Sequence, residues 1–159
     1  DFYRLAQRWE LPLVSFVDTP GFMVGPDSEA AGAPGVMSDL FIAGAHFDQP
    51  LATIFLRRGY GLGAMAMAGG SFDRPLISAS WPQGEFGAMG LEGAVKLGFK
   101  QELAAAPEGP EREALYQQLL NTLYERGQAV EAASYLEIDT VIDPADTRDT
   151  LLMALNIDH

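Results

Sequence analysis

The sequence predicts an α/β fold, because strand, turn and helix recur three times along it. Apolar stretches at residues 11–17, 51–56 and 75–80 have the length and composition of buried strands. Each is followed by a turn with glycine or proline and then by a segment of helical pattern. Turns at strand ends leave backbone N–H groups free to bind a ligand, so we expect the functional site there.

The remaining elements follow from the spacing of apolar residues. Residues 1–10 predict a helix that buries Phe2, Leu5 and Trp9 on one face. A loop is expected after the first strand, because prolines and glycines crowd it. The other expected segments are a weak helix at 29–44 interrupted by GAPG, a small-residue helix at 64–68, a turn into a helix near Gly90 within 85–100, a long helix at 111–134 with Leu115, Leu119, Leu123, Ala129 and Val130 on one stripe, an extended piece at 138–142 and a short helix from Thr147.

Composition restricts the class of protein and its partners. The 159 residues suit one domain, and 48% hydrophobic content is typical of a globular chain. Acidic residues outnumber basic ones by 22 to 10, which gives a formal charge of −12 and no basic run. Nucleic acid and anionic membranes require a concentrated cationic surface, so neither is expected as a partner. The absence of cysteine excludes disulfides and thiolate chemistry.

The chain also has the character of a piece of a longer polypeptide. It opens on Asp1 within a helical pattern, and no basic-then-apolar start predicts a signal peptide. The longest weakly polar run, residues 60–70, is too short to span a bilayer. We therefore expect a cytoplasmic protein, or a protein of the mitochondrial matrix if the source is eukaryotic.

Two glycine motifs suggest nucleotide binding, and both are weak. The turn DTPG at 18–21 resembles the magnesium-binding turn of GTPases, but no G-x-x-x-x-G-K-[ST] phosphate loop accompanies it. The run GYGLGA at 59–64 satisfies G-x-G-x-x-A after a strand. A dinucleotide fold would place an acidic residue at the end of the next strand, where Trp81 and Pro82 stand instead.

Side-chain catalysis has little support in this sequence. The two histidines are His46, which we expect to be a partly buried helical residue, and His159 at the last position. No nucleophile elbow and no His/Asp/Glu cluster with metal-ligand spacing is present, so no metal is expected. Asp18 could act as a general base, but an aspartate that opens a turn more often caps the backbone.

Backbone chemistry has better support. The glycine turn at 59–64 leads into a helix, so the N–H groups of Leu62 and Gly63 are expected to point outward at its positive end. Paired N–H donors of this kind stabilise a developing oxyanion. Substrates that form enolates at thioesters need little else from the protein.

The ordered motifs of the chain resemble one known family. They are VDTPGFMVG at 17–25, Glu29, Pro50, LRRGYGLGAMAMAGG at 56–70, WPQGEFGAMGLEGAV at 81–95 and IDTVIDPADTR at 138–148. Together these residues resemble the C-terminal half of the carboxyltransferase (beta) subunit of biotin-dependent acyl-CoA carboxylases, of the propionyl-CoA and acetyl-CoA type. The resemblance implies a crotonase-like ββα superhelix in which residues 1–159 form the C-terminal, biotin-side domain.

The resemblance also implies cofactors, partners and site residues. Carboxybiotin on a carrier domain would donate CO₂ to an acyl-CoA bound by a separate N-terminal half, and the active site would form between subunits of an oligomer that also works with a biotin carboxylase. Because biotin itself accepts the substrate proton, no side-chain base is required. The implied oxyanion hole consists of the amides of Leu62 and Gly63. The residues implied around biotin are Tyr60 and Gly61 in the same turn, Gly21 and Phe22 on the opposing loop, and Gly90 at the start of the helix behind.

The chain departs from the family at one notable place. Many members carry an Arg-His pair where this sequence has Gly35 and Val36. Without the CoA-binding half, the chain is expected to be inactive alone. Two alternatives stay open: a non-catalytic member with a structural or assembly role, and a crotonase-type acyl-CoA decarboxylase.

Overall fold

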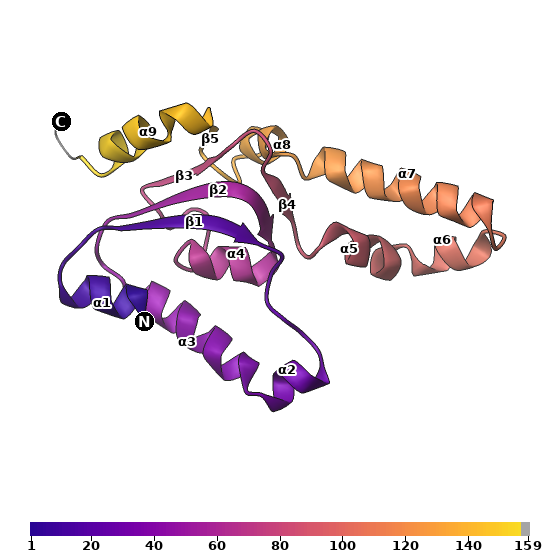
Figure 1. Cartoon of the computed structure of the whole chain (residues 1–159), viewed down its shortest axis with the longest axis horizontal. Helices are drawn as coiled ribbons and strands as arrows, with labels where there is room; N and C mark the ends of the chain where they lie inside the picture. Colours follow the sequence, from indigo (N-terminus) through magenta and orange to yellow (C-terminus); the bar gives the residue numbers. More distant parts are fainter. Residues whose placement is uncertain (157–159) are drawn as a thin grey trace.

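A parallel β-sheet organises the molecule in the computed structural model, which describes residues 1–156 (Figure 1). The sheet order is β1-β2-β3-β5, and β4 pairs with the far end of β2. Each of these pairings is parallel. The α/β class is therefore confirmed. The strands are β1 (Leu13–Thr19), β2 (Leu51–Tyr60), β3 (Ile77–Ser80), β4 (Glu85–Gly87) and β5 (Thr140–Val141).

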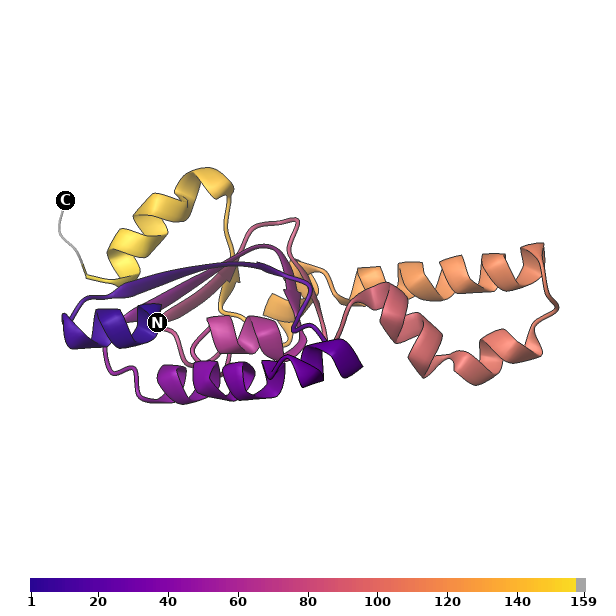
Figure 2. The ribbon, with the colours of Figure 1, turned by 60° about the horizontal axis from the view of Figure 1, so that its bottom comes forward.

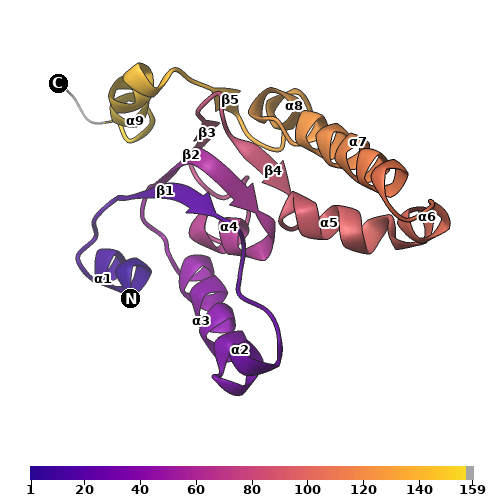
Figure 3. The same ribbon diagram turned by 45° about the vertical axis from the view of Figure 1, so that its right-hand side comes forward.

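Helices cover both faces of the sheet and also form a projecting arm. Helices α1, α3 and α4 lie on one face and α9 on the other, while α5, α6 and α7 extend away from the sheet (Figure 2). Figure 3 shows the arm from its side, with α5 and α7 next to each other. The helices are α1 (Phe2–Arg8), α2 (Pro26–Ala30), α3 (Ala33–Ala45), α4 (Gly61–Met67), α5 (Leu91–Gly98), α6 (Lys100–Ala105), α7 (Pro110–Arg126), α8 (Ala129–Ser134) and α9 (Thr147–Ala154), with a 3-10 turn, η1 (Pro144–Asp146), before α9.

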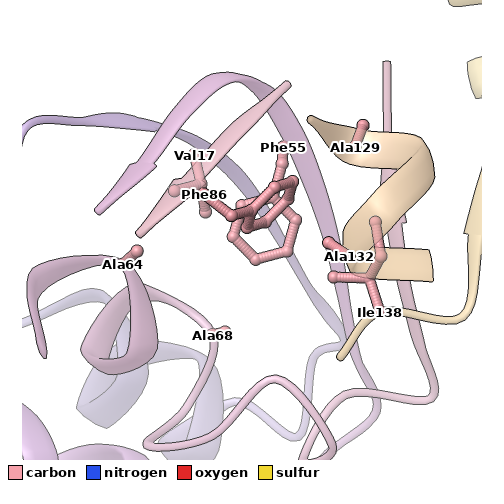
Figure 4. Close-up of a cluster of buried hydrophobic side chains, with 8 residues drawn as sticks. All are labelled: Val17, Phe55, Ala64, Ala68, Phe86, Ala129, Ala132 and Ile138. Atoms are coloured by element: carbon pink, nitrogen blue, oxygen red, sulfur yellow. The ribbon is translucent and has the colours of Figure 1, made fainter. Parts of the chain in front are cut away.

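The main core is built around three phenylalanine rings. Phe55 packs edge-to-face against Phe72 and Phe86, with ring centroids 4.8 and 4.9 Å apart. Val17 from β1 and small residues from α4 and α8 surround the rings (Figure 4). Aromatic rings in this geometry add to the stabilisation that their buried area supplies. The cluster joins β2, β4 and the helices beside them into one body.

Strand β2 is longer than the sequence predicts. It continues through Arg57 and Arg58 to Tyr60, where a turn was expected. Between the pairs Val17↔Phe55 and Thr19↔Gly59, β1 has one residue and β2 has three, which marks a bulge. The bulge re-aims the strand, and β4 then pairs with its last three residues. The extended β2 strand therefore leads directly into α4.

Strand β1 is displaced from the expected 11–17 and lies at the sheet edge. Its one fully buried side chain is Val17, whereas Phe16 is 49% exposed on the side of α9. An edge strand with one loosely covered face can retain an apolar composition, because β-branched and aromatic residues suit a pleated surface even when half-buried. The expectation of a fully buried strand was wrong for this element.

The expected long helix at 111–134 is two helices. Helix α7 ends at Arg126, and α8 begins at Ala129 with Val130 exposed. The break falls at Gly127, whose carbonyl accepts a 2.7 Å hydrogen bond from the N–H of Phe86. An ideal Cβ at Gly127 would overlap the carbonyl oxygen of Phe86, so contact with β4 requires glycine there. Helix α6 was also not predicted.

The first helix is confirmed, but it buries a different face. Phe2, Leu5 and Trp9 are exposed, and Tyr3 and Ala6 are buried. The Tyr3 hydroxyl donates hydrogen bonds to the carbonyls of Ala66 (3.2 Å) and Met67 (2.8 Å) at the end of α4. A buried phenol with two acceptors outweighs the apolar spacing that favoured the other face.

Within residues 1–156, no helix is both long and apolar enough to cross a membrane.

Candidate functional site

Three turns meet at one edge of the sheet. Because β2 pairs in parallel with both β1 and β4, the carboxyl ends of these strands point the same way. Gly21 lies in the turn after β1, Gly61 directly follows β2, and Ala88 directly follows β4. The carboxyl edge of a parallel sheet is the usual place for a ligand in α/β folds.

The turn after β1 is in direct contact with α4. An ideal Cβ on Gly63 would lie 2.9 Å from the carbonyl carbon of Gly21 and 3.1 Å from the backbone nitrogen of Phe22. Gly21 itself has φ +101°, and its own ideal Cβ would lie 3.3 Å from the Tyr60 carbonyl oxygen. The structure therefore brings together four of the expected site residues, by contacts that only glycines permit.

Gly61 joins the same cluster to the turn after β4. Its φ is +59°, and an ideal Cβ there would lie 2.7 Å from the carbonyl oxygen of Ala88. Gly90 starts α5 as expected, but nothing lies within 4 Å of its ideal Cβ. Ala88, which was not among the expected site residues, makes this contact with Gly61. Its position directly after β4 was the available signal, and β4 was not recognised as a strand.

Two backbone donors of α4 lie at this cluster. Leu62 and Gly63 belong to the first turn of α4, where N–H groups have no acceptor within the helix. Among residues 1–156, neither donates to a backbone acceptor outside the helix. The helix dipole adds partial positive charge there. Leu62 is 60% exposed, whereas Gly63 is buried next to the backbone of Gly21 and Phe22. This arrangement can hold a carbonyl oxygen and stabilise negative charge on it.

Tyr60 anchors the turn from inside. It is the last residue of β2 and is 4% exposed. Its hydroxyl donates a 2.7 Å hydrogen bond to Oε2 of Glu85. Burial, followed by the hydrogen bond and charge of Glu85, raises the pKa of the Tyr60 phenol well above its ordinary value near 10. The phenol therefore remains a hydrogen-bond donor and is not available as a base.

Phe22 lies between the turn cluster and a large apolar cavity. Its ring packs edge-to-face on Phe41 of α3, with centroids 6.3 Å apart. The cavity, of about 870 Å³, is bounded by the 22–24 loop and by α2 and α3, and Val36 is among its lining residues. Val36, which with Gly35 stands where the resemblance leads us to expect an Arg-His pair, therefore lines the same cavity as Phe22.

Asp18 has a different role from the one expected. Its carboxylate accepts hydrogen bonds from Arg57 Nη2 (3.2 Å), Arg58 Nε (3.0 Å) and the Arg58 backbone (3.2 Å). Partial burial opposes ionisation, but these bonds lower the Asp18 pKa below its usual value. The turn is capped instead by Thr19, whose Oγ1 accepts from the N–H of Gly21 at 3.2 Å. The bulge in β2 explains the difference, since it presents both arginines to Asp18.

Histidine contributes no chemistry to the described site. His46 is exposed at the end of α3, not partly buried, and its Nδ1 lies 2.8 Å from the Ile42 carbonyl oxygen. His159 lies outside the described residues. In residues 1–156 no group of three His, Asp or Glu side chains could hold a metal ion.

Comparison with known proteins agrees with this geometry. The chain has a crotonase-like fold, as its superposition on the two solved structures described below shows. The family model described as the carboxyl transferase domain matches residues 1–159. The chain belongs to the carboxyl transferase domain family.

Curated relatives align along nearly the whole chain. The methylmalonyl-CoA carboxyltransferase 12S subunit of Propionibacterium freudenreichii subsp. shermanii is 34% identical over 99% of this chain. The biotin-dependent acetyl-/propionyl-coenzyme A carboxylase beta6 subunit of Mycobacterium tuberculosis is 37% identical over 97% of it. The match covers 29% and 32% of those two relatives, so the chain spans about a third of their length.

Two solved structures support the fold. A single-chain, multi-domain long-chain acyl-CoA carboxylase superposes with a TM-score of 0.84 at 46% identity, over 96% of this chain and 15% of that one. The transcarboxylase 12S structure, a hexamer with methylmalonyl-CoA bound, superposes with a TM-score of 0.86 at 30% identity, over 98% of this chain and 29% of that one.

Proposed function

We propose that this chain is the C-terminal, biotin-side domain of a carboxyltransferase that moves CO₂ from carboxybiotin to the α-carbon of an acyl-CoA. The observation that carries the proposal is the cluster of three turns, in which the backbone N–H groups of Leu62 and Gly63 have no backbone acceptor among residues 1–156 outside α4. The names of two relatives, a methylmalonyl-CoA carboxyltransferase subunit and a biotin-dependent acetyl-/propionyl-coenzyme A carboxylase beta subunit, support the same reaction.

The residues at the cluster fit the ureido carbonyl of biotin. An ideal Cβ on Gly61 or Gly63 would collide with neighbouring backbone, so the turns approach as closely as backbone can. Two adjacent N–H donors at a helix start suit one carbonyl oxygen. Leu62 and Gly63 would hold that oxygen, while Gly21 and the backbone of Phe22 form the facing wall.

The chain's own residues then position the reaction and do not take part as acids or bases. When bound, carboxybiotin supplies the carboxyl group and a nitrogen that can accept the substrate proton. Tyr60 keeps its proton because burial and Glu85 raise its pKa. The free amides are already oriented, so they need no reorganisation as charge develops on the carbonyl.

The rest of the active site would come from other polypeptide. The chain spans about a third of its curated relatives, and we infer that a CoA-binding N-terminal half completes the acyl-CoA site. A biotin carrier and a biotin carboxylase would supply carboxybiotin. The relatives named as subunits and the hexameric 12S structure support an oligomer. We place it in the cytoplasm, or in the mitochondrial matrix if the source is eukaryotic.

A second candidate function rests on Gly35 and Val36. Val36 is 72% exposed and lines the cavity next to Phe22. If the family's Arg-His pair at this place positions substrate or a neighbouring subunit, a chain without it could serve assembly alone. An intact turn cluster favours catalysis, because an assembly role does not require free amides.

The test begins with the native complex. We expect this chain to purify with a CoA-binding half and a biotinylated carrier, and the complex to transfer labelled carboxyl from carboxybiotin to propionyl-CoA or a longer acyl-CoA. A complete complex that transfers nothing would support the assembly role and overturn the proposal. Loss of CO₂ from methylmalonyl-CoA without biotin would instead indicate a decarboxylase.

A further inference from the structure

We propose that Glu85 is a positioning residue, which acts through Tyr60 to hold the backbone amides of Leu62 and Gly63 in place. The inference rests on the proposed function, because it assigns those amides to the reaction. Glu85 lies on β4, more than 20 positions along the chain from the amides that it would position.

The connection begins with a tyrosine that is fixed at both ends. The backbone of Tyr60 pairs with Gly87 in the β2–β4 ladder. Its ring is buried, and its hydroxyl is bonded to Glu85 at 2.7 Å. A carboxylate acceptor makes this hydrogen bond stronger than one between neutral groups. Tyr60 therefore has little freedom to rotate or to shift along the strand.

Tyr60 is packed against the turn that carries the amides of Leu62 and Gly63, so its position determines theirs. Tyr60 precedes Gly61, which is left-handed and lies against the Ala88 carbonyl, and the Tyr60 carbonyl lies against Gly21. Because the turn is closely packed against both Ala88 and Gly21, no free space is left beside it. A movement of Tyr60 would therefore displace the turn.

Glu85 is itself held by its surroundings. Arg58 stands opposite it in the β2–β4 register, and Arg58 is bonded to Asp18 of β1. The backbone of Glu85 forms a bridge with Gln128 just after α7. These pairings hold the backbone of Glu85, whose carboxylate accepts from Tyr60.

The chain offers a matched control at the other end of the same helix. Tyr3 is also buried, and its hydroxyl donates to the carbonyls of Ala66 and Met67. Tyr3→Phe therefore removes a buried phenol bond to α4 without touching its first turn. A role in general stability would make Tyr3→Phe and Tyr60→Phe equivalent, whereas a positioning role makes them differ.

The experiment uses the complete carboxylase complex with Tyr60→Phe, Glu85→Ala, Glu85→Gln or Tyr3→Phe. For Tyr60→Phe and Glu85→Ala we expect kcat to fall about 10- to 100-fold, with KM for the acyl-CoA within about twofold of wild type. Glu85→Gln should recover most of the loss, because its amide oxygen accepts the same bond. Tyr3→Phe should retain kcat within about twofold.

Hydrogen exchange tests the positioning without any substrate. In Tyr60→Phe and Glu85→Ala we expect the amides of Met65 and Ala66, within α4, to exchange about 10-fold faster, while β2 residues 52–55 exchange as in wild type. Unchanged exchange and kcat in Glu85→Ala, or equal losses in Tyr3→Phe, would overturn the inference. If the wild-type complex transfers no carboxyl group, the proposed function fails, and exchange alone decides the effect of Glu85 on the turn.

Discussion

Gly63 and Gly21 lie closer together than any pair with a side chain at position 63 could. An ideal Cβ on Gly63 would lie 2.9 Å from the carbonyl carbon of Gly21 and 3.0 Å from its Cα. The atoms that it would meet are backbone, and they belong to the loop opposite the free amides. The spacing between the two walls of the candidate site is therefore set by the absence of one carbon atom.

Substitution of Gly63 by alanine should move these walls apart. The added methyl group must displace the Gly21–Phe22 backbone, and we expect a loss of about 1–3 kcal/mol in the free energy of unfolding. Carboxyl transfer should fall about 100-fold, because a shift near 1 Å disrupts alignment. Gly93→Ala on α5 is the matched control, since the nearest atom to its Cβ is a Met89 methyl at 3.9 Å. Wild-type rates in Gly63→Ala would contradict the site assignment.

Stability at alkaline pH should depend on Tyr60. Its pKa is raised in the folded protein above an ordinary value near 10, so the folded state binds the proton more tightly than the unfolded state. The resulting stabilisation is present below pH 10 and is lost as pH rises from there toward the folded pKa. Tyr60→Phe cannot ionise, and we expect its unfolding free energy to fall less steeply than that of wild type above pH 10. Parallel curves from urea unfolding between pH 8 and 11 would show that the phenol is not coupled to folding.

The Asp18–Arg58 pair should contribute little at neutral pH. The Asp18 side chain is 33% exposed, and ion pairs so open to water are worth about 0–1 kcal/mol. Its pKa is lowered in the folded state, so its contribution is present above pH 4 and is lost as pH falls further. We expect Asp18→Asn to cost at most about 1 kcal/mol at pH 7, and less at 1 M salt. A larger, salt-independent loss in thermal unfolding would show that Asp18 has a packing role.

Truncation of the aromatic core should be far more costly. Phe55 is fully buried between Phe72 and Phe86, and Phe55→Ala should lower the free energy of unfolding by about 3–5 kcal/mol. Phe2 is 78% exposed, and Phe2→Ala should change it by less than about 0.5 kcal/mol. Denaturant titration of Phe55→Ala and Phe2→Ala measures both changes in the free energy of unfolding. Similar midpoints would contradict the assignment of the core.

Much of the fold could be predicted from local patterns. The strand predicted at 75–80, the helix starting after Gly90 and the helix from Thr147 were all found, because short-range spacing and glycine or proline signals determine them. The predictions were wrong where contacts between residues far apart in the sequence determine the ends of an element. Gly127 ends α7 because it packs on Phe86, and β2 continues to Tyr60 because β4 pairs with it.

The same distinction between local patterns and distant contacts applies to the residues of the candidate site. Gly63 was expected from its turn, and Gly21 and Gly61 from the family resemblance. The structure places Gly63 against Gly21, and Gly21 against the Tyr60 carbonyl that precedes Gly61. Ala88 and Glu85 were not expected, since a three-residue strand gives almost no periodic signal. Asp18 was misassigned because its partners, the two arginines, are placed by a bulge that the sequence does not indicate.

The helical arm leaves the sheet and returns to it at one point. Phe86, just before the arm, is hydrogen-bonded to Gly127, just after it, and Gly84 is bonded to Ala129 (Figure 2). Because the two ends of the arm are already held together at the sheet, a change in the length of the arm does not move the strands. Doubling or halving the segment around α6 would change the entropy of loop closure by only about 0.6 kcal/mol. The arm can therefore vary in length, or accept an inserted module, while the turn that carries the amides of Leu62 and Gly63 keeps its position.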